Sequence, residues 1–491
     1  MDAALPRMVT LELEVAPEAV PVLRRSLALG RARALTLTWY DCDGALAGEG
    51  ITASASQLGR VAGWRAEALS APAGAAPVLL GEATSLAGLH LRDGLVAVAQ
   101  MAGQVREGRA GSVVLRLVNG QIGAAPGTAI ARLYLAGPAD AVAALTEPLA
   151  PAVRVPRSSL AATALALAGI AVPARPLGSP VLPAGLAPGD AFADAAAHLL
   201  GVLLHYAPRA EAGETGEPVH QMRVAMRRLR SLISVFGDAV ACPELAALAP
   251  GLKELAGALG PARDWDVFLA GTGAAVAAAF ADEGEIATLL AAAAARRADA
   301  YAALVPQLAG PALHVTALRI AILVQARPWA RPSIGPSDGP SDGYWDGTGD
   351  RVDTQDAART DTGVFAATVL ARRLRRLAKR AAHIGTAPEA ALHEMRIHAK
   401  RLRYAAEVFA PLFPARPARR FLKRLAALQD VLGLLNDGVV AASLMHDLAA
   451  EGGCGLAGGM VRGFVAARAA GARHAIARAY KRLRKAGPFW T

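Results

Sequence analysis

The sequence predicts a two-domain α+β protein, in which an N-terminal antiparallel β domain precedes an all-helical domain. Alternation of apolar and polar residues, which is typical of strands, is confined to the first ~150 residues. Helical periodicity replaces it after Asp190, and the helical region contains two similar halves. At 491 residues the chain is long enough for each domain to bury its own core.

The β domain is expected to span residues 1–175. Runs rich in Val, Thr and Leu predict strands at Met8–Val15, Ala34–Tyr40 and Ser112–Val118. Asn119-Gly120 follows the last run and predicts a hairpin turn. Helices are expected at Pro17–Leu29 and Asp140–Leu149. Residues 176–189 are rich in Pro and Gly and are interpreted as an interdomain linker.

The helical domain is expected to span residues 190–488, with halves at about 190–332 and 363–488. Between the halves, Ser333–Thr362 carries seven Asp against two Arg and is rich in Gly, Pro and Ser. Such a composition cannot build a core, so the segment is interpreted as a flexible acidic loop. Whether it competes with other anions for basic surface of the same chain is left open.

An internal repeat joins the two halves at a single offset of 173 residues. His220-Gln-Met-Arg-Val-Ala-Met-Arg-Arg-Leu-Arg230 aligns with His393-Glu-Met-Arg-Ile-His-Ala-Lys-Arg-Leu-Arg403. The same offset aligns Val235-Phe236 with Val408-Phe409, and Asp264 with Asp437. One offset held across separated blocks indicates two copies of one helical unit.

Each repeat places one histidine and three cations along a helical stripe. His220, Arg223, Arg227 and Arg230 fall within an arc of ~80° and along ~15 Å of helix. A single basic run is usually a solvated helix face, but two runs related by a repeat favour a shared function. Like charges four residues apart repel each other slightly, and a multivalent anion along the stripe would offset that cost.

The charge distribution favours a polyanionic partner. The formal net charge is +11, and Val364–Thr491 alone carries 23 Lys and Arg against 7 Asp and Glu. Nucleic acid, an anionic membrane surface and a phosphate polymer are the classes that such asymmetry favours. Three dispersed cysteines fit neither a metal site nor a disulfide framework, and are compatible with a reducing cytoplasm. No signal peptide is recognised at Met1–Ala3, and Leu160–Ala174 is too short to span a bilayer.

The two His-x-x-Arg-x-x-x-(Arg/Lys)-Arg-x-Arg blocks resemble those of the CHAD domain, over roughly Asp190–Lys485. The resemblance implies two pseudo-symmetric four-helix bundles that bind inorganic polyphosphate through a basic surface. It also implies a cytoplasmic protein associated with polyphosphate granules. The binding residues that it implies are His220, Arg223, Arg227, Arg228, Arg230, Lys253, Arg263, His393, Arg396, Lys400, Arg401, Arg403, Lys423 and Arg424.

The N-terminal region resembles a degenerate CYTH domain, the triphosphate-tunnel barrel, through Tyr40-Asp-Cys-Asp43…Gly50-Ile51. Glu12 and Glu14 match its opening strand and are weak candidates for metal ligands. Thr52–Ser56 replaces the family's alternating arginines, and Ile130–Leu135 replaces its paired glutamates. Because phosphoryl transfer in such a tunnel needs both groups, we expect a barrel-like fold without catalysis.

These observations predict that the chain binds inorganic polyphosphate, requires no cofactor and is not an enzyme. Arg predominates over Lys among the basic residues, which favours bidentate phosphate contacts. Few aromatic residues lie among them, which makes stacking on nucleic-acid bases less favoured. Two alternatives remain open: a triphosphatase or adenylate cyclase in the N-terminal domain, and a nucleic-acid-binding or scaffold protein. No membrane partner is predicted, and oligomeric state is left open.

Overall fold

The computed structural model describes residues 7–124, 126–330, 361–381, 384, 388–449, 455–470 and 472–490. The side chains of residues 330, 389, 435–439, 449 and 470 lie outside this description. The predicted acidic loop lies outside the described residues, except for Asp361 and Thr362. Thr362 is buried and begins a helix, so the helical domain resumes slightly earlier than predicted.

The N-terminal domain is a nine-stranded antiparallel sheet with the order β5-β4-β3-β2-β6-β7-β8-β1-β9. Its strands are β1 (Met8–Val15), β2 (Arg33–Asp41), β3 (Ile51–Leu58), β4 (Val61–Ala68), β5 (Leu79–Ala83), β6 (Val96–Ala110), β7 (Val113–Ile122), β8 (Thr128–Pro138) and β9 (Val153–Arg154). Its helices are η1 (Pro17–Ala19), α1 (Val20–Ser26), α2 (Ala45–Gly48), η2 (Ala87–Leu89), α3 (Ala139–Thr146) and α4 (Leu160–Leu167). The antiparallel β domain is therefore confirmed, and closure of its sheet into a barrel stays a prediction.

The predicted hairpin turn at Asn119-Gly120 is wrong. Both residues lie inside β7, where Asn119 pairs with Gln104 and Gly120 pairs with Gly103 of β6. A Cβ atom on Gly103 would lie 2.2 Å from the Asn119 carbonyl oxygen, so the two strands approach too closely for any side chain. The glycine at position 120 thus serves a close strand approach, and the chain reverses only after Ile122.

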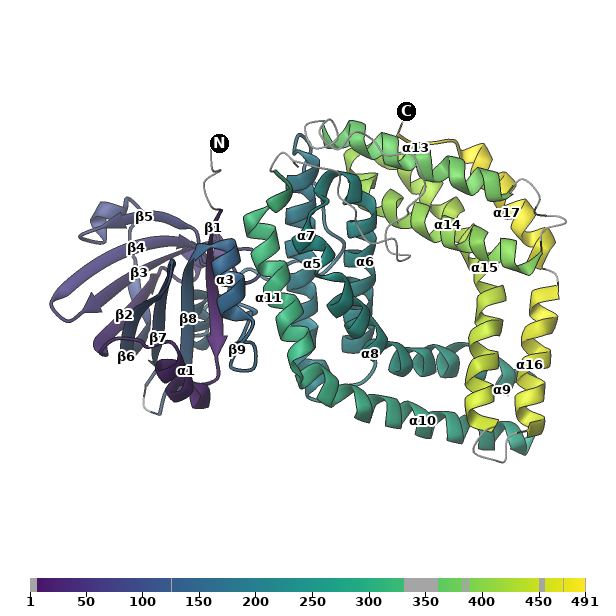
Figure 1. Cartoon of the computed structure of the whole chain (residues 1–491), viewed down its shortest axis with the longest axis horizontal. Coiled ribbons are helices and arrows are strands. Elements are labelled where there is room, and N and C mark those ends of the chain that lie inside the picture. Colours follow the sequence, from purple (N-terminus) through teal and green to yellow (C-terminus); the bar gives the residue numbers. More distant parts are fainter. Residues whose placement is uncertain are drawn as a thin grey trace.

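The helical domain consists of two four-helix groups and several further helices. Its ribbons form a ring in Figure 1. The first group contains α5 (Pro188–Glu211), α6 (Glu217–Val240), α8 (Ala249–Phe268) and α11 (Pro311–Ala326). The second contains α13 (Thr362–Ala381), α14 (Glu389–Phe409), α15 (Ala415–Ala449) and α17 (Ala472–Ala486). The other elements are α7 (Pro243–Ala246), η3 (Leu269–Gly273), α9 (Ala274–Ala279), α10 (Gly284–Ala309), η4 (Pro328–Ala330), η5 (Ala410–Leu412) and α16 (Gly455–Ala470).

The two groups meet where the repeated Val-Phe pairs come together. Phe236 of α6 and Phe409 of α14 occupy equivalent repeat positions, and their rings contact each other with centroids 5.4 Å apart. Phe365 of α13 stacks on Phe236 at 5.5 Å. These buried rings fix α6 against α14, because aromatic pairs bury large areas and prefer specific geometries.

A second apolar junction closes the ring at the opposite end. Trp265 and Phe268, at the end of α8, pack in one cluster with Leu289 of α10, Met445 of α15 and Val461 of α16. Figure 1 shows α8 and α10 running toward α15 and α16 along the lower side of the ring. The two halves are thus held together at both ends, which limits how far the repeated helices α6 and α14 can separate.

The sheet domain and the helical domain share one apolar cluster. Leu13 and Leu133 of the sheet belong to the same buried cluster as Leu200 of α5 and Leu318 of α11. Ion pairs join the surfaces at the rim, such as the one between Arg154 and Glu211 at 3.1 Å. This interface positions the sheet against the first helical group, as Figure 1 shows.

The predicted linker is packed against both domains. At its start, the guanidinium of the preceding residue, Arg175, donates a hydrogen bond to the Ala71 carbonyl oxygen at 2.8 Å, and within the linker Leu182 is buried in the cluster that the two domains share. Among the described helices, no single one has both the length and the hydropathy expected of a membrane span. The consecutive helices α10 and α11, which are bent by 51° relative to each other, reach that length and hydropathy only when they are taken together.

Candidate anion-binding site

The repeated helices α6 and α14 form an open pocket on one side of their contact. The cavity has a volume of about 230 Å³, and seven residues line it. These residues are Arg227, Arg230, Ser231 and Ser234 of α6, Arg373 of α13, and Arg401 and Tyr404 of α14. Among these described residues, four are cationic and none is acidic, so the pocket is suited to an anion.

Arg373 connects the three helices that build the pocket. Its side chain is buried, and its guanidinium donates hydrogen bonds to the Arg401 carbonyl oxygen at 2.7 Å and to the Ser234 carbonyl oxygen at 2.8 Å. The Ser234 hydroxyl accepts a further bond at 3.2 Å. A buried guanidinium requires such acceptors, because an unsatisfied one is costly. Arg373 therefore fixes the spacing between α6 and α14 while adding positive charge to the pocket.

Arg227 and Tyr404 face each other across the pocket. The Arg227 guanidinium lies over the Tyr404 ring, 5.5 Å from its centroid, in cation–π geometry. This contact restrains a long, exposed side chain and leaves guanidinium hydrogens available at the edge of the pair. The Ser234 hydroxyl on the same face can donate a hydrogen bond to an anion, whereas the Ser231 hydroxyl donates to the Arg227 carbonyl oxygen at 2.8 Å.

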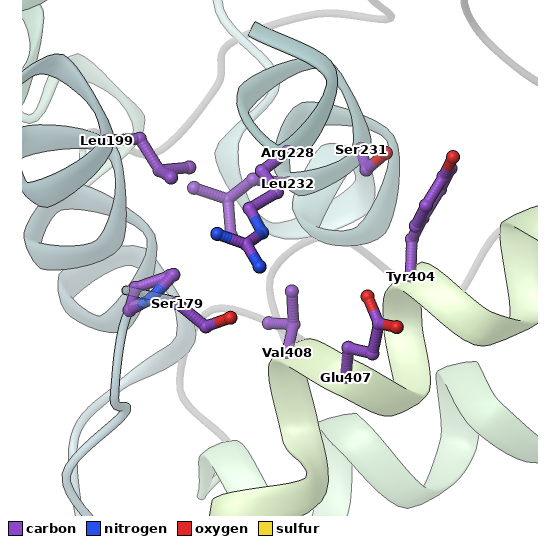
Figure 2. Close-up of a pocket in the computed structure, with 9 residues that line it drawn as sticks. Ser179, Leu199, Arg228, Ser231, Leu232, Tyr404, Glu407 and Val408 are labelled. Carbon is purple, nitrogen blue, oxygen red and sulfur yellow. The ribbon is translucent and has the colours of Figure 1, made fainter. Parts of the chain in front are cut away.

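The neighbouring arginine, Arg228, points to the other side of the α6–α14 contact. It lines a separate cavity of only about 20 Å³, together with Glu407 of α14 and Ser179 of the linker. Figure 2 shows the Arg228 side chain pointing into this cavity, toward Glu407 and Val408. Burial lowers the pKa of Arg228, and the Glu407 carboxylate acts in the opposite direction.

Three further predicted cations are engaged by carboxylates. Arg403 is 2.6 Å from the Glu407 carboxylate, and it also donates to the Gln429 side chain at 2.9 Å. Arg223 pairs with Asp264 at 3.2 Å. Burial raises the pKa of Asp264, against the effect of Arg223. The third pair joins Arg263 and Asp266 at 3.7 Å.

His220 begins its stripe in a half-buried position on α6. Burial lowers its pKa below the usual histidine value, and the cations Arg263 and Arg227 act in the same direction. The imidazole is therefore mainly neutral at neutral pH, as the charge around it leads one to expect.

The remaining predicted residues lie elsewhere on the helical domain. His393 is exposed on α14, and Arg396 and Lys400 are half-buried on the same helix without lining the described pocket. Lys253 is exposed on α8, and Lys423 and Arg424 are exposed on α15. Of the fourteen predicted binding residues, the structure thus gathers Arg227, Arg230 and Arg401 at the open pocket.

Sequence reasoning missed Arg373, Ser231, Ser234 and Tyr404 as pocket residues. The one signal for Arg373 is the basic amphipathic run Arg372-Arg373-Leu-Arg-Arg376. In the sequence, that run looks the same as a solvated basic helix face. Only the structure shows that Arg373 is buried.

In the sheet domain, the metal candidate Glu12 is buried and committed to other contacts. Its carboxylate is 3.2 Å from Arg132 and accepts a hydrogen bond from the Leu160 backbone N–H at 2.6 Å. Burial raises the pKa of Glu12 to about 7, against the opposing effect of Arg132. Glu14 is exposed and lies 3.9 Å from Arg132. Glu12 therefore anchors the start of α4 through one carboxylate oxygen, while its other oxygen, Oε2, is buried without a hydrogen-bond partner among the described residues.

The helix that Glu12 anchors is apolar. Leu160, Ala164 and Leu165 of α4 pack in one cluster with Trp39 of β2 and Met101 of β6. Asp41, which belongs to the tunnel-like motif, is also used structurally. Its carboxylate is buried and accepts bonds from backbone N–H groups of the following α2 turn, including Ala47 at 2.9 Å.

Comparisons with known proteins agree with this architecture. A family model described as CHAD domain matches residues 194–446. The crystal structure of the CHAD domain from the plant Ricinus communis is 28% identical, with a TM-score of 0.51, and the match covers 64% of this chain and 96% of that one. PptA from Streptomyces chartreusis is 16% identical, with a TM-score of 0.40, over 61% of this chain and 99% of that one.

A putative adenylate cyclase from Bacillus halodurans matches at 12% identity and a TM-score of 0.23, over 35% of this chain and 95% of that one. A search of curated proteins finds no match. The family model spans more than half of the chain, and the helices that it covers include both His-Arg repeats. The chain belongs to the CHAD domain family.

Proposed function

We propose that the helical domain binds inorganic polyphosphate, with the open pocket between α6 and α14 as its main contact. One observation carries this proposal: arginines from three helices line a single open cavity whose described lining contains no acidic residue. Bound phosphates would release counterions from the polymer, which is a favourable contribution that falls steeply with salt.

The chemistry of the lining favours phosphate over other anions. Guanidinium groups offer paired N–H donors that match two oxygens of one phosphate, and the Ser234 hydroxyl adds a single donor. A long polyphosphate chain would extend beyond the pocket to further exposed cations of the second helical group, such as Arg375 of α13 and Arg424 of α15. On this proposal, the protein associates with polyphosphate granules wherever the polymer accumulates.

Nucleic acid is the competing polyanion. Among the described residues that line the pocket, Tyr404 is the only aromatic one, and Arg227 already covers its ring. Base stacking would have to displace this contact, whereas a base-free polymer would not. The pocket thus favours polyphosphate over single strands.

A competition titration tests the proposal. Labelled long-chain polyphosphate is titrated into the full-length protein at two salt concentrations, then displaced with unlabelled polyphosphate, tripolyphosphate, or duplex DNA at equal phosphate concentration. We expect tight, salt-dependent binding that DNA displaces poorly. Displacement by DNA at equal phosphate concentration would identify nucleic acid as the ligand instead.

We also propose that the N-terminal domain is not a catalyst. The engagement of Glu12 by Arg132 and by the α4 backbone supports this, as does the apolar packing of α4 on β2 and β6. Incubation with triphosphate or ATP and either Mg²⁺ or Mn²⁺ should give no turnover. Metal-dependent turnover that vanishes in Glu12→Ala would establish catalysis.

A further inference from the structure

We propose that Glu407 closes a second anion pocket, so that this chain has one phosphate pocket where its duplicated helices would otherwise build two. This inference rests on the proposed function. Beyond that function, it states how many phosphate sites the chain has and which residue sets that number. It follows from comparing the two sides of the α6–α14 contact, position by position, through the internal repeat.

Four of the seven residues that line the open pocket have their repeat counterparts in the lining of the small cavity. An offset of 173 residues converts Arg228 and Ser231 of α6 into Arg401 and Tyr404 of α14. Arg401, Tyr404 and Ser231 line the open pocket, while Arg228, Ser231 and Tyr404 line the small cavity of Figure 2. Ser231 and Tyr404 lie between the two cavities and contribute to both. The small cavity is therefore the place where the repeat would put a second pocket.

Two substitutions between the repeats make this second side unlike the first. Ser234 of the open pocket is replaced by Glu407 at the equivalent position. Arg373, the buried cation of the open pocket, has Leu200 as its counterpart, and Leu200 lies buried in α5. The second side thus exchanges a hydroxyl for a carboxylate and loses one cation, and both changes disfavour an anion.

The Glu407 carboxylate is held in place by its neighbours. Arg403, the repeat counterpart of Arg230, lies 2.6 Å from it and thereby orients it. Ser179 and Pro180 of the interdomain linker complete the wall of the cavity, which has about 20 Å³ against about 230 Å³ on the open side. Figure 2 shows Arg228 and Glu407 entering this space from opposite helices. Within the described chain, Arg228 has no hydrogen bond or ion pair, so its cation remains available if the cavity opens.

Exchanging the residues at the two equivalent positions tests the proposal. Inorganic tripolyphosphate is titrated by calorimetry into full-length wild type, Glu407→Ser and Ser234→Glu. We expect wild type to bind one tripolyphosphate per chain. Glu407→Ser should bind two, the second more weakly because Leu200 supplies no charge. Ser234→Glu should lower the affinity of the wild-type site at least tenfold.

Glu394→Ser is the matched control, because it removes a carboxylate from the same helix. Glu394 is exposed and pairs with Arg380 at 2.8 Å, away from both cavities, so this variant should keep one site. A second site in Glu394→Ser would show that overall charge, and not position 407, sets the number of sites.

The remaining outcomes separate this inference from the proposed function. If wild type binds one tripolyphosphate and a folded Glu407→Ser also binds one, the inference is wrong while the proposed function stands. Two sites in wild type would also show that the inference is wrong.

If Glu407→Ser fails to fold, the Ser234→Glu variant alone tests the inference. An unchanged tripolyphosphate affinity in Ser234→Glu would contradict the equivalence of positions 234 and 407. Absence of tripolyphosphate and polyphosphate binding in all variants would overturn the proposed function and, with it, this inference.

Discussion

At the scale of single residues, a few buried charged groups determine what the two domains can do. Arg373 is the clearest case, because its guanidinium reaches the backbone of two other helices and the lining of the pocket at once. Glu12 has a similar role in the sheet domain, where its buried carboxylate accepts a backbone hydrogen bond at the start of α4. Each of these two residues leads to a separate testable prediction.

Replacing Arg373 with leucine, the residue at its repeat counterpart, should lower both stability and anion affinity. Loss of its charged hydrogen bonds should reduce the free energy of unfolding by about 1–3 kcal/mol. Urea denaturation checks this figure, and polyphosphate titration checks affinity. For stability, Arg375→Leu is the control, because it removes the same charge from an exposed position on α13. Equal stability of the two variants would show that the Arg373 hydrogen bonds contribute little.

Glu12 predicts a specific pH dependence of stability. Its folded-state pKa of about 7 lies above the ordinary glutamate pKa of 4.5, so between these pH values the folded state holds a proton that the unfolded state has lost. Raising the pH through this window therefore destabilises the wild type through this group, by up to roughly 3 kcal/mol. Glu12→Gln removes the titrating group, so its stability relative to wild type should increase from pH 4.5 to pH 7.

Thermal or chemical denaturation at several pH values measures this difference. Glu14→Gln is the control, because it removes a carboxylate from an exposed position on the same strand. A constant difference between Glu12→Gln and wild type would show that Glu12 keeps an ordinary pKa in the folded protein.

At the scale of helices, the basic residues of α6 and of α14 are each divided between two tasks. Arg227 and Arg230 of α6 line the open pocket, whereas Arg223 turns to Asp264 on α8. On α14, Arg401 lines the pocket and Arg403 turns to Glu407. The cations of one helix thus serve ligand binding and helix–helix contact at once, and cations as close as two or four residues apart have different roles.

This division predicts unequal effects of mutating the stripe. Arg227→Ala with Arg401→Ala should weaken polyphosphate binding and reduce the slope of log affinity against log salt by about 1–2, since two phosphate contacts are lost. Arg223→Ala should have a smaller effect, because its partner is Asp264. Arg24→Ala with Arg25→Ala removes the same charge from exposed α1 and should leave the slope unchanged. A slope that is unaffected by the pocket variant would contradict the assignment of the site.

At the scale of the whole molecule, the sheet and the first helical group share one core. Gly74 lies at their junction, where a Cβ atom would lie 2.9 Å from Ala321 of α11 and 3.0 Å from Val155. The continuous apolar cluster leads us to expect a single cooperative unfolding transition for both domains.

Gly74→Val should disturb this junction. The added side chain collides with α11, so we expect a loss of about 2–4 kcal/mol and a separation into two transitions in calorimetry. Gly59→Val is the control, because Gly59 has a similar positive φ of 62° but no atom within 4 Å of the added Cβ. It carries the backbone strain without the collision. Two transitions in Gly59→Val would mean that strain alone, and not the junction, separates the domains.

The sequence by itself determined the order of the domains, the duplication of the helical unit and its basic character. Periodicity reports which residues share a face of one helix, and it assigned β1, β2, α6 and α14 to their segments. It also led to an error at Asn119-Gly120, because a glycine that permits a close strand approach resembles a glycine in a turn.

Only the tertiary structure decided which charges meet. Helical periodicity fixes the angle of a side chain around its own axis, but not which neighbouring helix faces it. The packing of Phe236 against Phe409 sets that orientation and brings Arg227, Arg230 and Arg401 together. It also turns Arg228 to the other side, toward Glu407, and adds Arg373 from a third helix. Those contacts depend on residues far apart in the chain, where local pattern carries no information.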